Sequence, residues 1–264
     1  MIPLRALIRK EAAVLFASPV AYLTLTMVGI VTALVFFDHL RVYNQTLFVW
    51  SSSTMGGFET DTIPDYINLR DLVFLPVMEQ LALMLIGLVP LVTMRVFAEE
   101  RARGTDELLA TTQLSHDQIV AGKFLAAFGF VALMLAVSFV YPAASIVKAG
   151  LGLRHLLAVY SGLLAVGLGI ASIGLVCSAF TSSQLVAAVS AYAVAFVVYD
   201  FSWANEFLRE SPGAAAFLDA ISLHPRFRGF AEGLISLADV AYFAGLAAVC
   251  FGIARLSLDL ERVR

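Results

Sequence analysis

The charged residues that could do chemistry gather in one segment, residues 95–123. Its first part reads Arg-Val-Phe-Ala-Glu-Glu-Arg-Ala-Arg-Gly-Thr-Asp-Glu-Leu-Leu, so carboxylate and guanidinium groups follow one another over a few helical turns. Glu99 and Arg103 stand four residues apart, in the order that favours an ion pair on a helix surface. The chemistry that these residue types offer is ion pairing, within the chain or with a soluble partner.

Local signals divide this segment into short helices. Gly104 supplies the left-handed residue that commonly ends a helix. Thr105 can cap a new helix over residues 105–113, which has acidic residues in its first turn. Ser115 and Gln118 match a capping box that starts a further helix. This pattern predicts a stiff helical elbow that transmits force from a soluble partner. The alternative is an ordinary loop with good caps and solvated charges.

Other kinds of reactive site find no support. Lys123 follows Gly122, but the glycine spacing and the hydroxyl residue of a phosphate-binding P-loop are missing. The four histidines are scattered without metal-ligand spacing, and neither HExxH nor GxSxG occurs. We therefore expect no catalytic, cofactor-binding or metal-binding residue in this chain, and we expect that any ATP and Mg are bound by another chain.

The amino-acid composition indicates that the predicted elbow belongs to a membrane protein. Of 264 residues, 60% are hydrophobic and 14% are charged, and the mean hydropathy is +0.88. A soluble domain carries roughly 25% charged residues, so this chain has too little polar surface to be a cytosolic enzyme. The two cysteines lie in apolar runs and form no CxxC, which excludes a disulfide framework. The chain is predicted to be a polytopic membrane protein.

Six apolar segments approach the length of about 20 residues that crosses a bilayer. They are residues 20–37, 72–94, 124–147, 156–180, 185–201 and 237–256. With the N-terminus inside, ten Lys and Arg residues face the cytoplasm and seven face outwards, which favours cytoplasmic placement of both termini. Residues 95–123 are then cytoplasmic.

The same topology gives two outer loops, residues 38–71 and 202–236. The first, rich in Ser, Thr and Gly, is predicted to be irregular. In the second, residues 226–235 suit either a short helix at the outer membrane interface or a loop that docks on the bundle. All 264 residues form one transmembrane domain.

Two acidic residues, Glu79 and Asp200, fall near the outer membrane face. A charge within the bilayer is a functional hypothesis by default, so Glu79 could contact a substrate. However, Pro76 could start the helix and place Glu79 in its first turn, where the helix dipole favours an anion. Asp200 is similarly placed at the outer end of the fifth segment. The substrate and structural interpretations both stay open.

The order of several motifs resembles that of ABC type 2 permeases. Residues 97–109 resemble that family's F-A-E-E-(K/R)-x-x-G-T-x-E-L-L signature, and residues 118–125 resemble its Q-I-V-x-G-K-F-L. Arg9-Lys10-Glu11 and residues 18–23 are also typical. Residues 224–230 and 239–243 are similar to patterns of the gliding-motility GldF-type branch. The resemblance spans the whole chain, with one departure at Thr112-Gln113, where many relatives carry a Pro.

This resemblance implies an all-α permease with six transmembrane helices in the bacterial inner membrane. It also implies cytoplasmic ABC ATPase subunits docked on residues 95–123 and a second permease copy, most simply as a homodimer in the lipid bilayer. An auxiliary membrane subunit with a large extracytoplasmic domain is compatible with the GldF-type branch, and no nucleic acid partner is implied. The coupling residues would be Glu99, Glu100, Arg103, Gly104, Thr105 and Glu107.

Three functions remain open at this stage. The first is ATP-driven export or translocation of a solute, which a polar cavity between two copies would favour. The second is mechanical work or gliding-motility-type signalling without a solute, which a sealed apolar bundle would favour. The third is a passive membrane scaffold, which predicts no ATPase partner.

Overall fold

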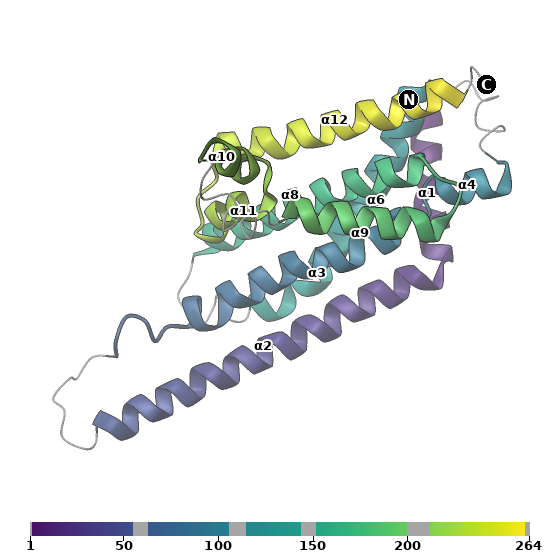
Figure 1. Cartoon of the computed structure of the whole chain (residues 1–264). Helices are drawn as coiled ribbons and strands as arrows, with labels where there is room; N and C mark the ends of the chain where they lie inside the picture. The colour runs from purple at the N-terminus through teal and green to yellow at the C-terminus, as the bar shows by residue number, and fades with distance from the viewer. Residues whose placement is uncertain (1, 55–62, 106–114, 144–151, 200–211, 262–264) are drawn as a thin grey trace.

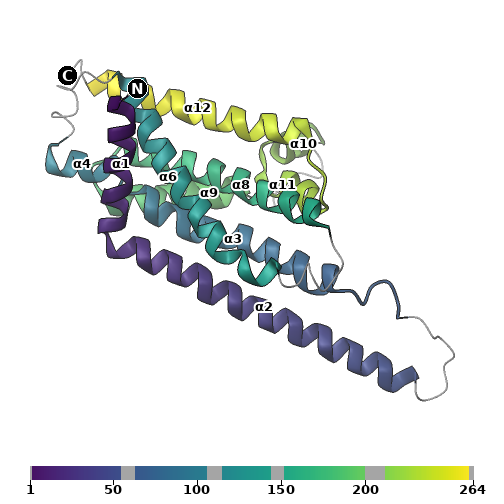
Figure 2. The same cartoon turned by 180° about the vertical axis from the view of Figure 1, so that it is seen from behind.

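The computed structural model describes residues 2–54, 63–105, 115–143, 152–199 and 212–261, and within them all regular structure is helical (Figure 1). The helices are α1 (Ile2–Ala17), α2 (Pro19–Thr54), η1 (Arg70–Phe74), α3 (Leu75–Thr93), α4 (Ala98–Arg103), α6 (His116–Ser138), α8 (Leu153–Ala179), α9 (Gln184–Tyr199), α10 (Pro212–Ile221), α11 (Leu223–Ala231) and α12 (Leu237–Glu261). Both termini and α4 lie at the same end of the bundle (Figures 1 and 2).

Helix α8 is the centre of the bundle and packs against α3, α6, α9, α11 and α12. Its glycines let the neighbouring helices approach closely, as small residues do in membrane bundles. A Cβ built on Gly174 would lie 2.0 Å from Thr93 Oγ1 of α3, and one built on Gly162 would lie 2.4 Å from Phe230 Cβ of α11. Larger side chains at these positions would push α3 and α11 away from α8.

Five helices are long and apolar enough to cross a bilayer: Pro19–Ser52, Arg70–Arg103, His116–Ser138, Leu153–Ala179 and Leu237–Leu260. The predicted fifth span corresponds to α9, which has 16 described residues and measures about 24 Å. That length falls short of a hydrocarbon core of about 30 Å. The all-helical, multi-pass architecture is confirmed, while the count of six spans and the cytoplasmic side of the termini stay predictions.

The prediction of an irregular outer loop from residue 38 is wrong for residues 38–54. Helix α2 continues to Thr54, which makes it 36 residues and about 54 Å long. Once a helix is nucleated, each added residue gains a backbone hydrogen bond for the conformational entropy that it loses. Residues 38–54 contain no Gly or Pro that would end the helix. The hydroxyls of Ser51 and Ser52 bond to carbonyls three residues earlier in the same helix, both at 2.9 Å. Helix α2 therefore projects past the rest of the bundle (Figure 1).

Helix α3 does begin beside Pro76, at Leu75, but Glu79 is not in the first turn of the whole helix. The π-helical turn η1 starts at Arg70 and runs directly into α3. Asn68 precedes this turn, and its Oδ1 accepts a hydrogen bond from the backbone N–H of Asp71 at 2.7 Å. Glu79 accordingly lies nine residues, or about 14 Å, beyond the start of the helix rather than in its first turn.

The second outer loop contains the short helix α11, which docks on the bundle. Phe227 and Phe230 of α11 are fully buried, and the ring centroid of Phe230 lies 6.4 Å from that of Phe243 in α12. The guanidinium of Arg226 pairs with the Asp239 carboxylate at 3.1 Å and lies 4.2 Å from the ring centroid of Tyr242. The residues that resemble the GldF-type patterns thus hold α11 against α12.

Candidate coupling site

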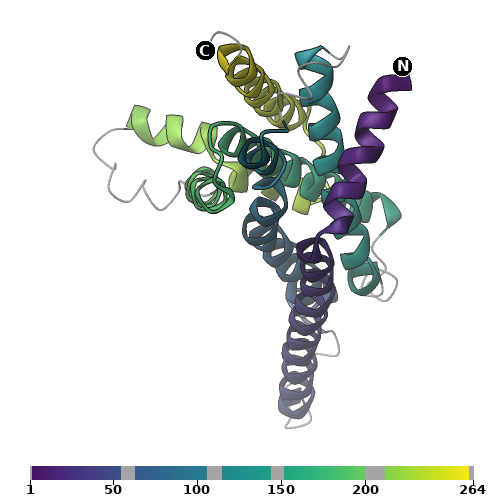
Figure 3. The same cartoon turned by 90° about the vertical axis from the view of Figure 1, so that its right-hand side faces the viewer.

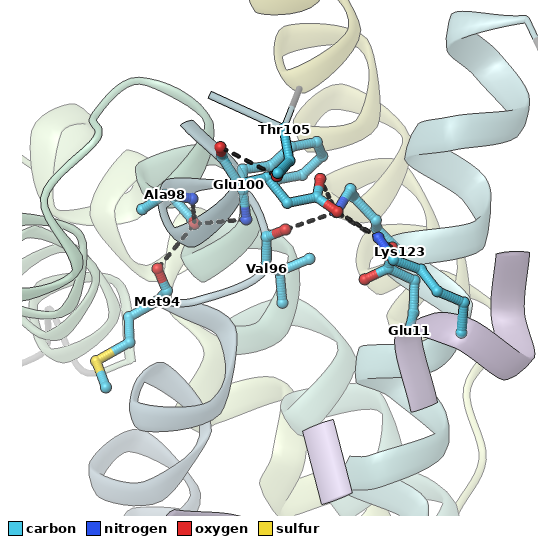
Figure 4. A network of polar contacts seen from close by, with 10 residues as sticks. Glu11, Met94, Val96, Ala98, Glu100, Thr105 and Lys123 are labelled. Atoms are coloured by element: carbon cyan, nitrogen blue, oxygen red, sulfur yellow. Dashed lines mark hydrogen bonds and ion pairs between the residues drawn. The ribbon is translucent and has the colours of Figure 1, made fainter. Parts of the chain in front are cut away.

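The corner between α3 and α4 is held by one serine of α8. The backbone N–H groups of Phe97 and Ala98 donate to Ser178 Oγ at 3.1 and 3.0 Å, and this hydroxyl donates to the Met94 carbonyl at 3.0 Å (Figure 4). The first N–H groups of a helix have no partner within that helix, so Ser178 caps α4 from outside it. Ser178 is fully buried, so water cannot substitute for these bonds.

Helix α4 ends where the sequence predicts. Gly104 has a φ of +64°, its N–H donates to the Arg101 carbonyl, and the N–H of Thr105 donates to the Glu100 carbonyl at 3.0 Å. This paired arrangement is a Schellman motif. The predicted pair of Glu99 and Arg103 is also confirmed, with 2.6 Å between Oε1 and Nη2.

The start of α6 confirms the predicted capping box. The N–H of Gln118 donates to Ser115 Oγ at 3.3 Å, and the N–H of Ser115 donates to Gln118 Oε1 at 3.2 Å. The short helix predicted for residues 105–113 falls on residues 106–114, which are outside the described ranges. Two breaks of the predicted elbow are therefore confirmed, and the helix between them stays a prediction.

We expect Gly104→Pro to disrupt the end of α4, and Gly104→Asn to be tolerated. Proline cannot adopt a positive φ and removes the N–H that bonds to Arg101, whereas asparagine enters the left-handed region more easily than other residues. The proline variant should lose about 3 kcal/mol of stability and the asparagine variant about 1 kcal/mol or less. Thermal unfolding of the two purified variants measures this; equal melting temperatures would contradict the assigned role of Gly104.

A buried ion cluster links α4 to α1 and α6. Lys123 of α6 is 1% exposed, and its Nζ lies 2.7 Å from Glu100 Oε2 and 3.4 Å from Glu11 Oε1 (Figure 4). It also donates to the Val96 carbonyl at 2.6 Å. Lys10 of α1 pairs with Glu11 at 3.0 Å and with Glu100. Two cations thus meet two carboxylates, which satisfies the requirement that buried charges be paired.

The surroundings shift the pKa values of two members of this cluster, Glu100 and Lys10, in the direction expected for paired charges. Burial alone would raise the pKa of Glu100, but Lys123 and Lys10 outweigh burial and hold its pKa below the usual value. Burial alone would lower the pKa of Lys10, but Glu100 and Glu11 outweigh it and raise its pKa. Glu100 and Lys10 are therefore held in their charged forms near neutral pH.

The end of α12 is tied to the same region. Arg101 of α4 donates to Ser257 Oγ at 3.1 Å, and this hydroxyl donates to the carbonyl of Ala179 in α8 at 2.8 Å. At the start of α6, His116 Nδ1 lies 2.6 Å from the carboxylate of Asp259. A displacement of α4 would therefore act together on the ends of α1, α6, α8 and α12 that lie near α4.

A cavity of about 150 Å³ lies between α1 and the α3–α4 corner. Charged groups from both sides line it, among them Lys10, Glu11, Arg95 and Glu99, and Lys123 lies at its base from α6. Apolar walls come from Val14, Leu15 and Val96. The two elements are thus joined by ion pairs around an incompletely filled space rather than by close apolar packing.

The structure brings together most of the residues predicted to couple. Glu99, Glu100, Arg103, Gly104 and Thr105 lie on α4 and its cap. Glu107 and Asp200 fall outside the described ranges, and Glu79 lies on α3, 20 residues before Glu99. The described residues contain no group of three His, Cys, Asp or Glu that could hold a metal ion.

Four residues of this site were not predicted from the sequence: Lys10, Glu11, Lys123 and Ser178. Lys10, Glu11 and Lys123 stand inside motifs that resemble the family's, but nothing in the spacing of Glu11 and Lys123 pairs residues 112 positions apart. Ser178 lies in the apolar segment of residues 156–180, where no neighbouring residue marks it as a cap. Its role as a cap depends on the position of α8 and could not be found from local sequence.

Comparison with known proteins identifies the family of this chain. The family model described as ABC-2 family transporter protein matches residues 5–207, which is more than half of the chain and includes α1, the α3–α4 corner and α6. No curated protein matches the chain. The chain is a multi-pass membrane protein that belongs to the ABC-2 family of transporter proteins, in which it is a permease subunit.

Proposed function

We propose that this permease subunit couples ATP hydrolysis by a separate cytoplasmic ABC ATPase to export or translocation across a bacterial inner membrane. In this proposal two copies of the chain form a homodimer, and both termini face the cytoplasm. The ATPase binds residues 95–123, and its closure displaces α4. The bundle then switches between two arrangements as a rigid body.

The observation that carries this proposal is the ion cluster in which the buried Lys123 and Glu11 meet the partly buried Glu100 and the exposed Lys10. A passive scaffold has no need for a set of paired charges, two of them buried, that joins three helices at one corner. Charged groups hold a defined geometry while the cavity beside them leaves room for α4 to shift relative to α1. The cluster can thus pass a push on α4 to α1 and α6, which lead into α2 and the core.

Purification of the tagged chain from its native membrane, under conditions that preserve other complexes, tests this function. We expect a stoichiometric chain with Walker motifs to co-purify and its ATPase activity to change when the complex is reconstituted in lipid. The variant Glu100→Gln should lower that coupled activity several-fold. Arg70→Ala, which removes an exposed ion pair with Asp71 outside residues 95–123, is the control and should change it little.

Two results would overturn the proposal. If no ATPase co-purifies while other membrane complexes remain intact, the elbow has no partner that could displace it. The chain would then be a passive membrane scaffold. If an ATPase binds but its activity is the same with the wild-type chain, Glu100→Gln and Arg70→Ala, the cluster is structural and the coupling route lies elsewhere.

One observation favours the second candidate function, mechanical work on an outer subunit. From residue 37 to residue 52 no described side chain of α2 is buried, and Phe48 and Val49 are 73% and 64% exposed. A helix that extends beyond the bundle with exposed apolar groups would suit contact with an auxiliary subunit. Recovery of such a subunit with the complex, lost in Phe48→Ser, would favour this function over transport.

A further inference from the structure

Glu79 lies on the one face of α3 that the bundle leaves uncovered. Helix α3 packs between α2 and α9, and the three run side by side (Figures 1 and 3). Glu79, Gln80, Leu83 and Gly87 are exposed along it, with the spacing of one helix stripe. The hydroxyl of Tyr192 from α9 donates to the Gly87 carbonyl at 2.5 Å and borders this stripe.

The carboxylate of Glu79 lies well inside the apolar part of its helix. Residues 72–94 are apolar apart from this residue, Gln80 and Thr93, and Glu79 comes seven residues after their start, about 10 Å along the axis. Because the helix begins at Arg70, the dipole of a first turn does not stabilise this charge. A carboxylate at such a depth is costly unless a cation or water accompanies it.

The described part of the chain supplies no such cation, because Glu79 makes no ion pair or hydrogen bond within it. The apolar segments of the flanking helices, residues 20–37 and 185–201, contain no Lys or Arg, and the nearest cation along its own helix is Arg70, about 14 Å away. A second copy in the same membrane orientation would place its cations at the same depths. It would therefore add a second Glu79 rather than a counter-charge.

A second polar group lies beside this stripe without a partner. The hydroxyl of Thr32 in α2 is buried, with the residue 2% exposed, and forms no hydrogen bond within the described chain. It lines a small cavity of about 10 Å³ between α2 and α3, together with Gln80. Unsatisfied buried polar groups are rare and often mark sites that an additional molecule completes.

We propose that this face of α3, the Glu79 stripe, binds a lipophilic organic cation as the translocated substrate, with Glu79 as the residue that selects positive charge. The inference rests on the proposed transport function and names its substrate class. Leu83 and the apolar faces of α2 and α9 contact the apolar part of the molecule, and the Glu79 carboxylate contacts its charge.

The test compares two ions of the same size and shape, tetraphenylphosphonium and tetraphenylborate. Binding of each is measured by equilibrium dialysis to the complex purified with its ATPase in lipid nanodiscs, with empty nanodiscs as the background. We expect the cation to bind the wild-type complex and its affinity to fall about tenfold or more in Glu79→Gln, as for loss of a charged contact. Glu79→Asp should retain a preference for the cation.

The control is Asp71→Asn, which removes an exposed carboxylate near the start of the same helix and should leave binding unchanged. Loss of cation binding in Glu79→Gln alone supports the inference. If cation binding is equal in the wild-type complex and in Glu79→Gln, or if the intact complex binds neither ion, the inference is overturned. Recovery of the ATPase, measured in the same samples, reports separately on the proposed function.

Discussion

Replacing Lys123 by methionine is expected to destabilise the chain by about 3 kcal/mol, because it removes the buried one of the two cations that Glu11 and Glu100 share. Glu11 is 5% exposed, so solvent cannot replace the ammonium group. The decrease in the free energy of unfolding should stay at the lower end of the usual range for a broken buried ion pair, since Lys10 still contacts both carboxylates. Unfolding in denaturant from mixed micelles measures the difference from wild type.

Arg103→Ala is the matched control for this prediction. It also removes a cation that pairs with a glutamate of α4, but the Arg103 side chain is 69% exposed. Exposed pairs contribute about 0–1 kcal/mol, so the control should remain close to wild type. Similar losses of stability in Lys123→Met and Arg103→Ala would mean that burial does not increase the contribution of the Lys123 ion pairs to stability.

A double variant separates the loss of the pair from the loss of packing. In Lys123→Met with Glu100→Gln, one cation and one anion are removed together, and Glu11 keeps Lys10 as its partner. Part of the stability lost in Lys123→Met should return, because replacing a whole buried pair is much less costly than breaking it. If the double variant is less stable than Lys123→Met, the cost comes from cavity formation instead.

The features that sequence reasoning found are those whose partners are close along the chain. The left-handed Gly104, the pair of Glu99 and Arg103 and the capping box of Ser115 with Gln118 each depend on residues within four positions of one another. Helix geometry alone brings such residues together, whatever the rest of the fold does. The apolar runs were equally visible, because a membrane span needs only length and hydropathy.

The features that could not be predicted from the sequence depend on how the helices pack against one another. Lys123 meets Glu100 and Glu11 only because α1 and α4 both lie against α6, and no local pattern encodes that arrangement. The extension of α2 was missed because Ser and Thr usually indicate a loop, whereas here their hydroxyls bond within the helix. Pro76 suggested a helix start, but the π turn η1 precedes it and carries the helix back to Arg70.

The role of Ser178 leads to the second large effect, a loss of about 2–3 kcal/mol in Ser178→Ala. The substitution removes one buried oxygen that accepts from the N–H groups of Phe97 and Ala98 and donates to the Met94 carbonyl. A buried polar group left without a partner costs about 1–3 kcal/mol, and here at least two donors lose theirs. The α3–α4 corner should loosen, so coupled ATPase activity should fall together with the melting temperature.

The control variant Ser172→Ala tests whether the loss of stability in Ser178→Ala comes from the hydrogen bonds at the α3–α4 corner. Ser172 lies on the same helix and is equally buried, but its hydroxyl bonds only to the Leu168 carbonyl one turn earlier, at 2.6 Å. That carbonyl keeps its place in the helix, so the control should cost less than about 1 kcal/mol. Equal losses in the two variants would assign the effect to cavity formation in α8. If only Ser178→Ala loses stability, the loss comes from the cap that α8 provides for α4. In that case α8 takes a direct part in any movement of the α3–α4 corner.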